Sequence, residues 1–122
     1  MARPRSTAGN ELPVIADTLD LLTWTIGRVE KFPRLHRLSL GLRLQTGMHD
    51  LLDLLIEARY SSDRLRLLNL CSVRVEQIRL AFRVACDLKI LALSSHEFAC
   101  RRLAEIGRQV GGWKRQQEQK AP

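Results

Sequence analysis

The sequence predicts an all-α domain folded as an up-and-down antiparallel four-helix bundle. Leucine dominates the apolar content, and only 7 glycines and 4 prolines occur in 122 residues. A sheet protein of this size would contain more β-branched and aromatic residues. Apolar residues also recur at alternating steps of three and four in four separate runs, which is the spacing of one helix face. Short links between the runs favour antiparallel neighbours.

The third run, residues 62–89, is predicted to form the central helix. Its core-facing seam consists of Leu68, Cys71, Val75, Ile78, Phe82 and Ala85. Ser61, Ser62 and Asp63 offer side-chain acceptors to the first free N–H groups of this helix, and a carboxylate suits its positive end. A second row on the same helix is charged and must face solvent or a partner: Glu76, Arg79, Arg83 and Asp87.

The first helix is predicted to begin near Leu12 or Pro13, because proline is tolerated in a first turn. It should end at about Lys31, before Pro33. The repeating apolar positions in this run are Ile15, Leu19, Leu22, Ile26 and Val29. Residues 32–37 then form the connection to the second helix.

The second helix, predicted over residues 38–60, is apolar nearly all the way round. Its seam is Leu40, Leu44, Gly47, Leu51, Leu54 and Ala58, and further apolar residues are Leu38, Leu42, Met48, Leu52, Leu55 and Ile56. One small bundle core cannot cover every side of a helix, so part of this one is expected to lie against another copy of the chain. The alternative is a wide core stripe.

The fourth helix is predicted to start at a capping box formed by Ser94 and Glu97. Its seam is Ala99, Leu103, Ile106, Val110 and Trp113. Three glycines, Gly107, Gly111 and Gly112, either allow close approach of another backbone or end the helix near Trp113. The domain organisation is therefore a disordered N-terminal tail (1–11), the bundle (12–113) and a basic C-terminal tail (114–122).

The chain is strongly basic, with 20 Lys and Arg against 13 Asp and Glu and a net charge of +7. This charge suits an anionic partner, nucleic acid first and a membrane surface second. The candidate phosphate contacts are Arg34, Arg37, Arg43, Arg79, Arg83, Arg101, Arg102, Arg108, Lys114 and Arg115. Arg79 and Arg83 are partly offset by neighbouring acids on the same helix. Because few aromatic rings are available for stacking, binding should be led by shape and charge.

No catalytic or metal-binding constellation is evident, so we expect a non-enzymatic binding protein without a cofactor. His49, Asp53 and Glu57 lie one turn apart, but the Glu-x-x-His pairs of a di-metal bundle are missing, and pairing with arginines explains these acids better. There is no G-x-S-x-G motif and no phosphate-binding P-loop.

The three cysteines, Cys71, Cys86 and Cys100, are far apart and form no C-x-x-C motif. We interpret them as buried or half-buried small hydrophobic residues in a reducing compartment. No apolar run is long enough to span a bilayer, and no signal-peptide pattern opens the chain. A cytoplasmic protein without a membrane partner is expected.

Three phrases resemble one family: KFPRLHRLSLGLRL (Lys31 to Leu44), LLDLLIEARY (Leu51 to Tyr60) and EFACRRLAEIGRQVGGW (Glu97 to Trp113). Together they are similar to the accessory variability determinant proteins of diversity-generating retroelements. The resemblance implies a homopentameric barrel of four-helix bundles with a basic surface. It also implies a reverse transcriptase partner, which with template RNA makes the adenine-mutagenised cDNA, and no catalytic residues in the accessory protein.

The alternative is a related four-helix bundle of the type encoded in intervening sequences of ribosomal RNA. Such a protein would act as a structural or interaction module without a reverse transcriptase. A neighbouring reverse transcriptase gene and a repeated template and variable region would favour the retroelement interpretation.

Overall fold

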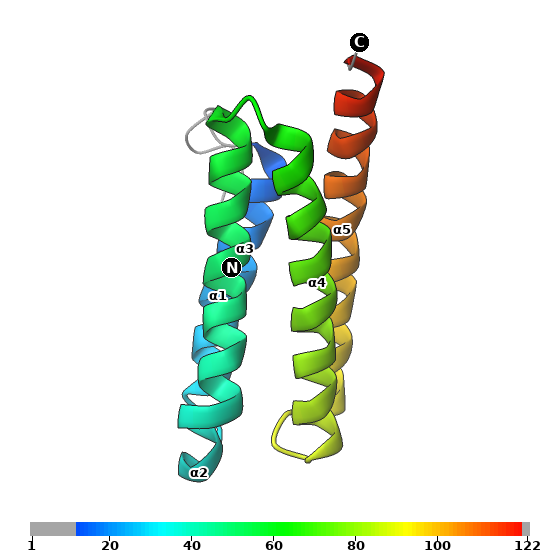
Figure 1. Cartoon of the computed structure of the whole chain (residues 1–122). Coiled ribbons are helices and arrows are strands. Elements are labelled where there is room, and N and C mark those ends of the chain that lie inside the picture. The colour runs from blue at the N-terminus through cyan, green and yellow to red at the C-terminus, as the bar shows by residue number, and fades with distance from the viewer. Residues whose placement is uncertain (1–11, 121–122) are drawn as a thin grey trace.

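A computed structural model describes residues 12–120 and confirms the all-α prediction. Four long helices and one short helical corner make up this part of the chain, which contains no strand. The long helices are α1 (Pro13–Val29), α3 (Leu42–Tyr60), α4 (Arg64–Asp87) and α5 (Leu93–Lys120). They run alternately in opposite directions, and each packs against two of the others (Figure 1). The predicted N-terminal tail, 1–11, lies outside the described residues.

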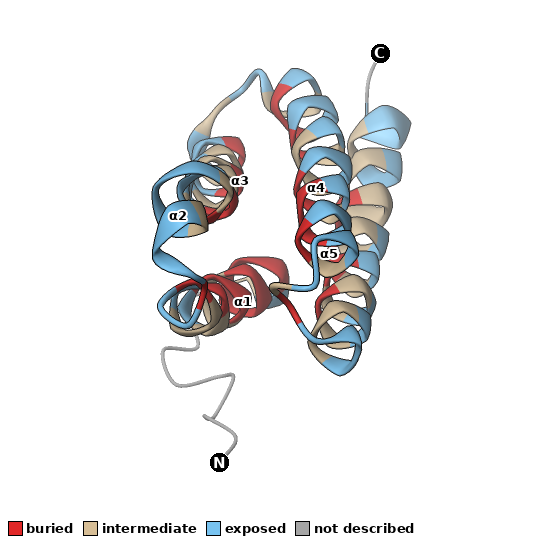
Figure 2. Ribbon diagram, turned by 90° about the horizontal axis from the view of Figure 1, so that it is seen from below, coloured by how far each residue is buried: buried red, intermediate tan, exposed pale blue. Residues whose placement is uncertain are grey.

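The core fills the space enclosed by the four helices, where their buried faces converge (Figure 2). The predicted seam of α4 is buried apart from Val75, which is only partly buried. On α5, the first four residues of the predicted seam are fully buried, and Trp113 is partly buried. The heptad-like spacing therefore located the inner faces of these two helices correctly.

The buried face of α1 is rotated relative to the predicted seam. Leu19 is only half-buried and Ile26 is 38% exposed, whereas Thr18 and Thr25 are buried. Each of these threonine hydroxyls donates to the backbone carbonyl four residues earlier, at 2.8 Å and 2.7 Å. Because those bonds satisfy the hydroxyls, the threonines can occupy core positions.

The inner face of α3 differs by one residue from the predicted seam in two places. It buries Leu44, Met48, Leu51, Leu55 and Ala58. Gly47 instead lies at the margin against α4, where an added Cβ atom would lie 3.0 Å from Cγ1 of Ile78. Leu42 and Ile56 remain on the surface, 54% and 42% exposed. Part of the apolar surface of α3 is therefore left uncovered by the bundle core, as predicted.

The connection between α1 and α3 is helical. It consists of the short helix α2 (Arg34–His36) and the π-helical turn η1 (Arg37–Gly41), so α3 begins later than predicted. Gly41 is buried, and a Cβ atom there would lie only 2.6 Å from Cγ1 of Val29. Glycine therefore allows this corner to pack closely against the last turn of α1.

Both ends of α4 are held by interactions other than those predicted. Asp63 precedes the helix, but its carboxylate pairs with Arg66 and caps no backbone N–H group. At the other end, Lys89 has a positive φ of 62°, and the N–H groups of Lys89 and Ile90 bond to carbonyls of the last turn at 2.9 and 3.1 Å. This Schellman arrangement ends α4 earlier than predicted.

α5 is longer than predicted at both ends. It begins at Leu93, so Ser94 lies inside the first turn and cannot act as the N-cap of a capping box. It continues to Lys120 through all three glycines that were considered as its possible end, and most of the basic tail predicted over 114–122 is therefore helical. The added residues are Lys, Arg, Gln and Glu, which favour a helix.

Candidate nucleic-acid interface

Three of the predicted phosphate contacts lie at the corner between α1 and α3, at the lower end of the bundle in Figure 1. Arg34, Arg37 and Arg43 are all exposed. None of them forms an ion pair with another described residue. We call them the corner cluster, and their guanidinium groups can approach an anion without first breaking such a pair.

The two predicted contacts on α4 are paired along the helix, which confirms the sequence interpretation. Arg79 donates two hydrogen bonds to the carboxylate of Glu76, one of them at 3.0 Å. Hydrogen bonding to Glu76 raises the pKa of Arg79, and hydrogen bonding to Arg79 lowers the pKa of Glu76. Nε of Arg83 lies 3.8 Å from a carboxylate oxygen of Asp87. Part of the charge of both arginines is therefore balanced locally.

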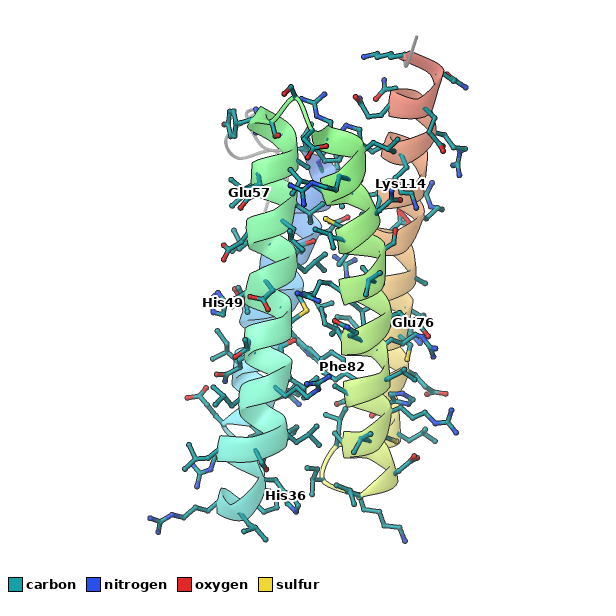
Figure 3. All side chains as sticks on the ribbon, viewed as in Figure 1. His36, His49, Glu57, Glu76, Phe82 and Lys114 are labelled. Atoms are coloured by element: carbon teal, nitrogen blue, oxygen red, sulfur yellow. The ribbon has the colours of Figure 1, made fainter. Side chains whose placement is uncertain are left out.

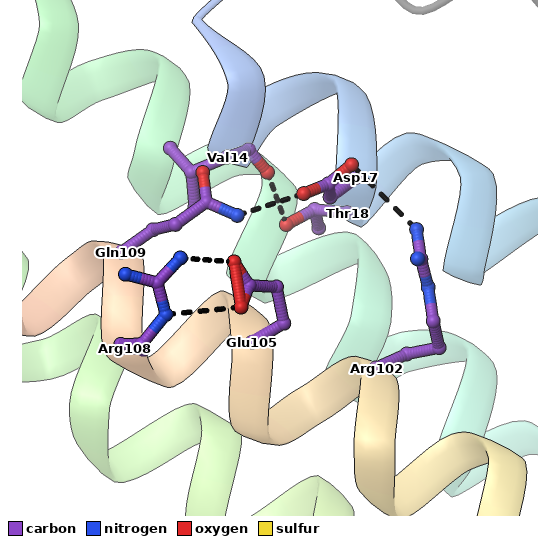
Figure 4. A network of polar contacts seen from close by, with 7 residues as sticks. All are labelled: Val14, Asp17, Thr18, Arg102, Glu105, Arg108 and Gln109. Atoms are coloured by element: carbon purple, nitrogen blue, oxygen red, sulfur yellow. Dashed lines mark hydrogen bonds and ion pairs between the residues drawn. The ribbon is translucent and has the colours of Figure 1, made fainter.

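The predicted contacts on α5 lie in different environments. Arg101 is exposed and has no ion pair within the described residues. Arg108 donates two hydrogen bonds to Glu105, one of them at 3.0 Å, and this bonding raises the pKa of Arg108 (Figure 4). Nζ of Lys114 lies 3.5 Å from Oγ of Ser72 on α4. Of these three cations, Arg101 is the most accessible to an anion.

Arg102 belongs to a polar network around the buried Asp17 that joins α5 to α1 (Figure 4). Its Nη2 atom lies 3.6 Å from Oδ1 of Asp17, whose side chain is only 1% exposed. Gln109 donates a hydrogen bond of 2.7 Å to Oδ2 of the same carboxylate. Arg102 therefore balances a charge inside the fold, a role that the sequence analysis did not recognise.

A groove opens between the N-terminus of α1 and the last turns of α5. Its lining includes Arg59, Arg64, Arg108, Trp113 and Arg115. Arg64 donates from Nε and Nη2 to carbonyls of the last turn of α3 at 2.6 and 2.9 Å, and its guanidinium carbon lies 5.7 Å from the centroid of the Trp113 ring. The predicted contacts Arg108 and Arg115 thus converge with Arg59 and Arg64, which were absent from the candidate set.

Two apolar stripes lie on the outer surface of the bundle. The α4 stripe comprises side chains that are 37% to 52% exposed: Leu70, Val73, Leu80, Val84 and Leu88. The α3 stripe comprises two pairs of side chains that are 42% to 83% exposed, Leu38 with Leu42 and Ile56 with Tyr60, and the exposed His49 and Asp53 lie between the pairs. Uncovered apolar surface on α3 was predicted from the sequence. The α4 stripe was not predicted, because the charged row beside it marked that side of the helix as polar.

One of the three thiols has a histidine neighbour, since Sγ of Cys100 lies 3.4 Å from Nε2 of His96, one turn earlier on α5. Cys71 is buried, and burial raises the pKa of its thiol to about 12, while Cys86 and Cys100 are half-buried. This burial agrees with their interpretation as buried or half-buried residues, and all three are free. His49 and Glu57 point away from α4 (Figure 3). Among the described residues, no group of three His, Cys, Asp or Glu side chains is placed to hold a metal ion.

The described helices would have to be both long and apolar to cross a bilayer. None of these helices combines the two properties sufficiently to cross a membrane. Two kinds of surface feature are suited to binding a partner. They are the exposed cations at the ends of the bundle and the two apolar stripes.

These features define a class of protein: a basic four-helix bundle with surfaces suited to binding. The model of the bAvd-like family matches residues 14–117. The chain therefore belongs to the bAvd-like family, and its expected kinship with accessory variability determinant proteins is confirmed. Proteins of this family are generally accessory and non-catalytic. No curated protein matches the chain.

Proposed function

We propose that this protein is the non-catalytic accessory protein of a diversity-generating retroelement. In this role it binds the reverse transcriptase of the element and its template RNA or cDNA, and it supports mutagenic retrohoming in the cytoplasm. The bAvd-like family match over residues 14–117 carries the proposal. The net charge of +7 and the exposed corner cluster support an anionic partner.

Co-purification with the reverse transcriptase of the same element tests this role. The tagged protein should retain the polymerase after nuclease treatment, which separates direct contact from tethering through RNA. A protein that binds nucleic acid but never retains the polymerase would instead support a bundle of the ribosomal RNA intervening-sequence type.

The affinity for RNA is expected to fall linearly with salt concentration on a log–log plot. The double variant Arg34→Gln, Arg37→Gln removes two exposed charges that are not ion-paired to described residues. It should reduce the slope of this plot by about two and the affinity by about tenfold or more. Fluorescence anisotropy with labelled RNA over a salt series measures both quantities.

The double variant Arg79→Gln, Arg83→Gln is the matched control for that measurement. It removes the same formal charge from arginines that already pair with acids on their own helix. We therefore expect a smaller loss of affinity than at the corner cluster. A flat salt response, or an equal loss in both double variants, would contradict the assignment of the corner cluster.

We also propose that the protein forms a homo-oligomer in which the α4 stripe of one copy packs on the α3 stripe of the next. Exposed apolar side chains that gather along one helix commonly mark a protein–protein contact. Two different stripes suit a heterologous interface, which generates a closed ring when the rotation between copies allows it. The resemblance to accessory variability determinant proteins supports five copies in that ring.

The double variant Leu80→Glu, Val84→Glu is expected to convert the oligomer into monomers, because it places carboxylates in the middle of the α4 stripe. Light scattering during gel filtration measures the mass at fixed protein concentration. The matched control is Ile26→Glu, which adds a carboxylate at a 38% exposed apolar position of α1 and should leave the mass unchanged. A monomeric wild type, or an unchanged mass of the double variant, would refute this contact.

A further inference from the structure

We propose that the groove between the N-terminus of α1 and the last turns of α5 binds one unpaired nucleotide of a single-stranded nucleic acid. A phosphate would lie between Arg59 and Arg115, and the base would lie against the surface formed by Arg64 and Trp113. This inference rests on the proposed nucleic-acid binding and adds a preference for unpaired strands to it.

The charge of the groove favours a phosphate. Four arginines contribute to its lining, and no acidic residue does so among the described residues. Only Arg108 of the four forms an ion pair with a described acid, Glu105, so no described acid balances the charges of the other three arginines in the groove. The N-terminus of α1 also lines the groove, and its first turn carries no acidic residue. The positive end of that helix dipole adds to the attraction for an anion.

The Arg64–Trp113 pair supplies a flat surface whose position is fixed. Two carbonyls hold the Arg64 guanidinium, which lies near the Trp113 ring as described above. The indole itself is half-buried, so it loses little freedom when a ligand binds. Bases of unpaired strands stack on aromatic rings and on guanidinium planes, and such stacking does not depend on sequence.

An unpaired nucleotide matches this groove better than an acidic peptide or a duplex does. A carboxylate peptide would satisfy the arginines, but it offers no ring for the Arg64–Trp113 surface. A duplex presents phosphates, but its bases remain stacked inside the helix and cannot reach the groove. The combination of a phosphate and an accessible base is specific to single strands.

The fluorescence of Trp113 tests this assignment directly. Trp24→Phe in the full chain removes the other tryptophan, which lies at a distance from the groove against Phe82 and Phe98. A 5′-phosphorylated oligothymidylate of about ten nucleotides should quench Trp113, because bound bases contact the indole region. The same oligonucleotide paired with its complement should quench much less. Anisotropy of a labelled oligonucleotide reports total binding in parallel.

Two double variants in this background separate the groove from the rest of the basic surface. Arg59→Gln with Arg115→Gln should abolish most of the quenching and weaken single-strand binding by about tenfold, because it removes the proposed phosphate contacts. Lys31→Gln with Lys89→Gln changes the charge equally at the opposite end of the bundle, just after the C-termini of α1 and α4, and should preserve the quenching. Thermal melting by circular dichroism confirms that both variants remain folded.

Three outcomes would overturn the inference. Binding of the oligonucleotide without a change in Trp113 fluorescence would refute the groove while leaving nucleic-acid binding in place. Equal quenching by polyglutamate would show a general anion site. A complete lack of oligonucleotide binding, seen by anisotropy as well, would refute the proposed nucleic-acid binding and the groove with it.

Discussion

Changing Arg102 to glutamate is expected to lower the free energy of unfolding by about 3 kcal/mol, the low end of the range for breaking a buried ion pair. The substitution replaces the cation beside Asp17, a carboxylate only 1% exposed, with a second carboxylate. The side chain of Arg102 is itself 30% exposed, so water moderates the repulsion. Urea unfolding followed by circular dichroism, at one fixed protein concentration, should show a lower midpoint with an unchanged slope.

The neighbouring residue provides the control for this experiment. Arg101→Glu makes the same change of charge at an exposed position and should alter stability by less than about 0.5 kcal/mol. Asp17→Asn added to Arg102→Glu should restore part of the loss, because the amide oxygen can still accept from Gln109 and the repulsion is gone. Equal stability of the Arg101 and Arg102 variants would show that the ion pair between Arg102 and Asp17 contributes nothing to the stability of the fold.

Replacing Phe82 with alanine is expected to cost about 3 to 5 kcal/mol, the range for removing a large aromatic side chain from a core. The ring is fully buried and points into the space between the helices (Figure 3). It also lies 6.1 Å from the ring of Trp24, so the cavity would open beside a second aromatic side chain. Thermal and urea unfolding both measure the loss.

Two further variants determine whether that loss arises from the cavity. Phe82→Leu fills most of the space and should recover more than half of the stability. Arg83→Ala, at the exposed neighbouring position, should change stability by less than about 0.5 kcal/mol. A loss below about 1 kcal/mol for Phe82→Ala would mean that the helices move together to fill the space.

Much of the fold could be predicted because helix geometry is local. The seam of α5 and the inner face of α4 follow from spacings of three and four residues, and both were located correctly. The buried face of α1 was not located correctly, because two overlapping faces fit its sequence. Leu19 and Ile26 belong to the predicted face, whereas Thr18 and Thr25 belong to the face that is buried. Only contact with the neighbouring helices decides between two overlapping faces.

The contacts of the candidate site are also of two kinds. Those within one helix could be predicted from the sequence, and those between helices could not. The pairing of Arg79 with Glu76 was predictable, because the two residues lie three positions apart on one helix. The contact of Arg102 with Asp17 joins α5 to α1, and no local spacing announces it. The approach of Arg64 to Trp113 likewise depends on how α4 and α5 lie side by side.

The sequence by itself determined that this protein is a basic, four-helix, leucine-rich bundle, because helical periodicity and net charge depend only on the order and kind of residues. The tertiary structure decided which cations remain available to a ligand. Ion pairs and grooves between helices depend on the rotation and register of each helix against the next. Those quantities arise from packing the whole core, and no single segment of sequence contains them.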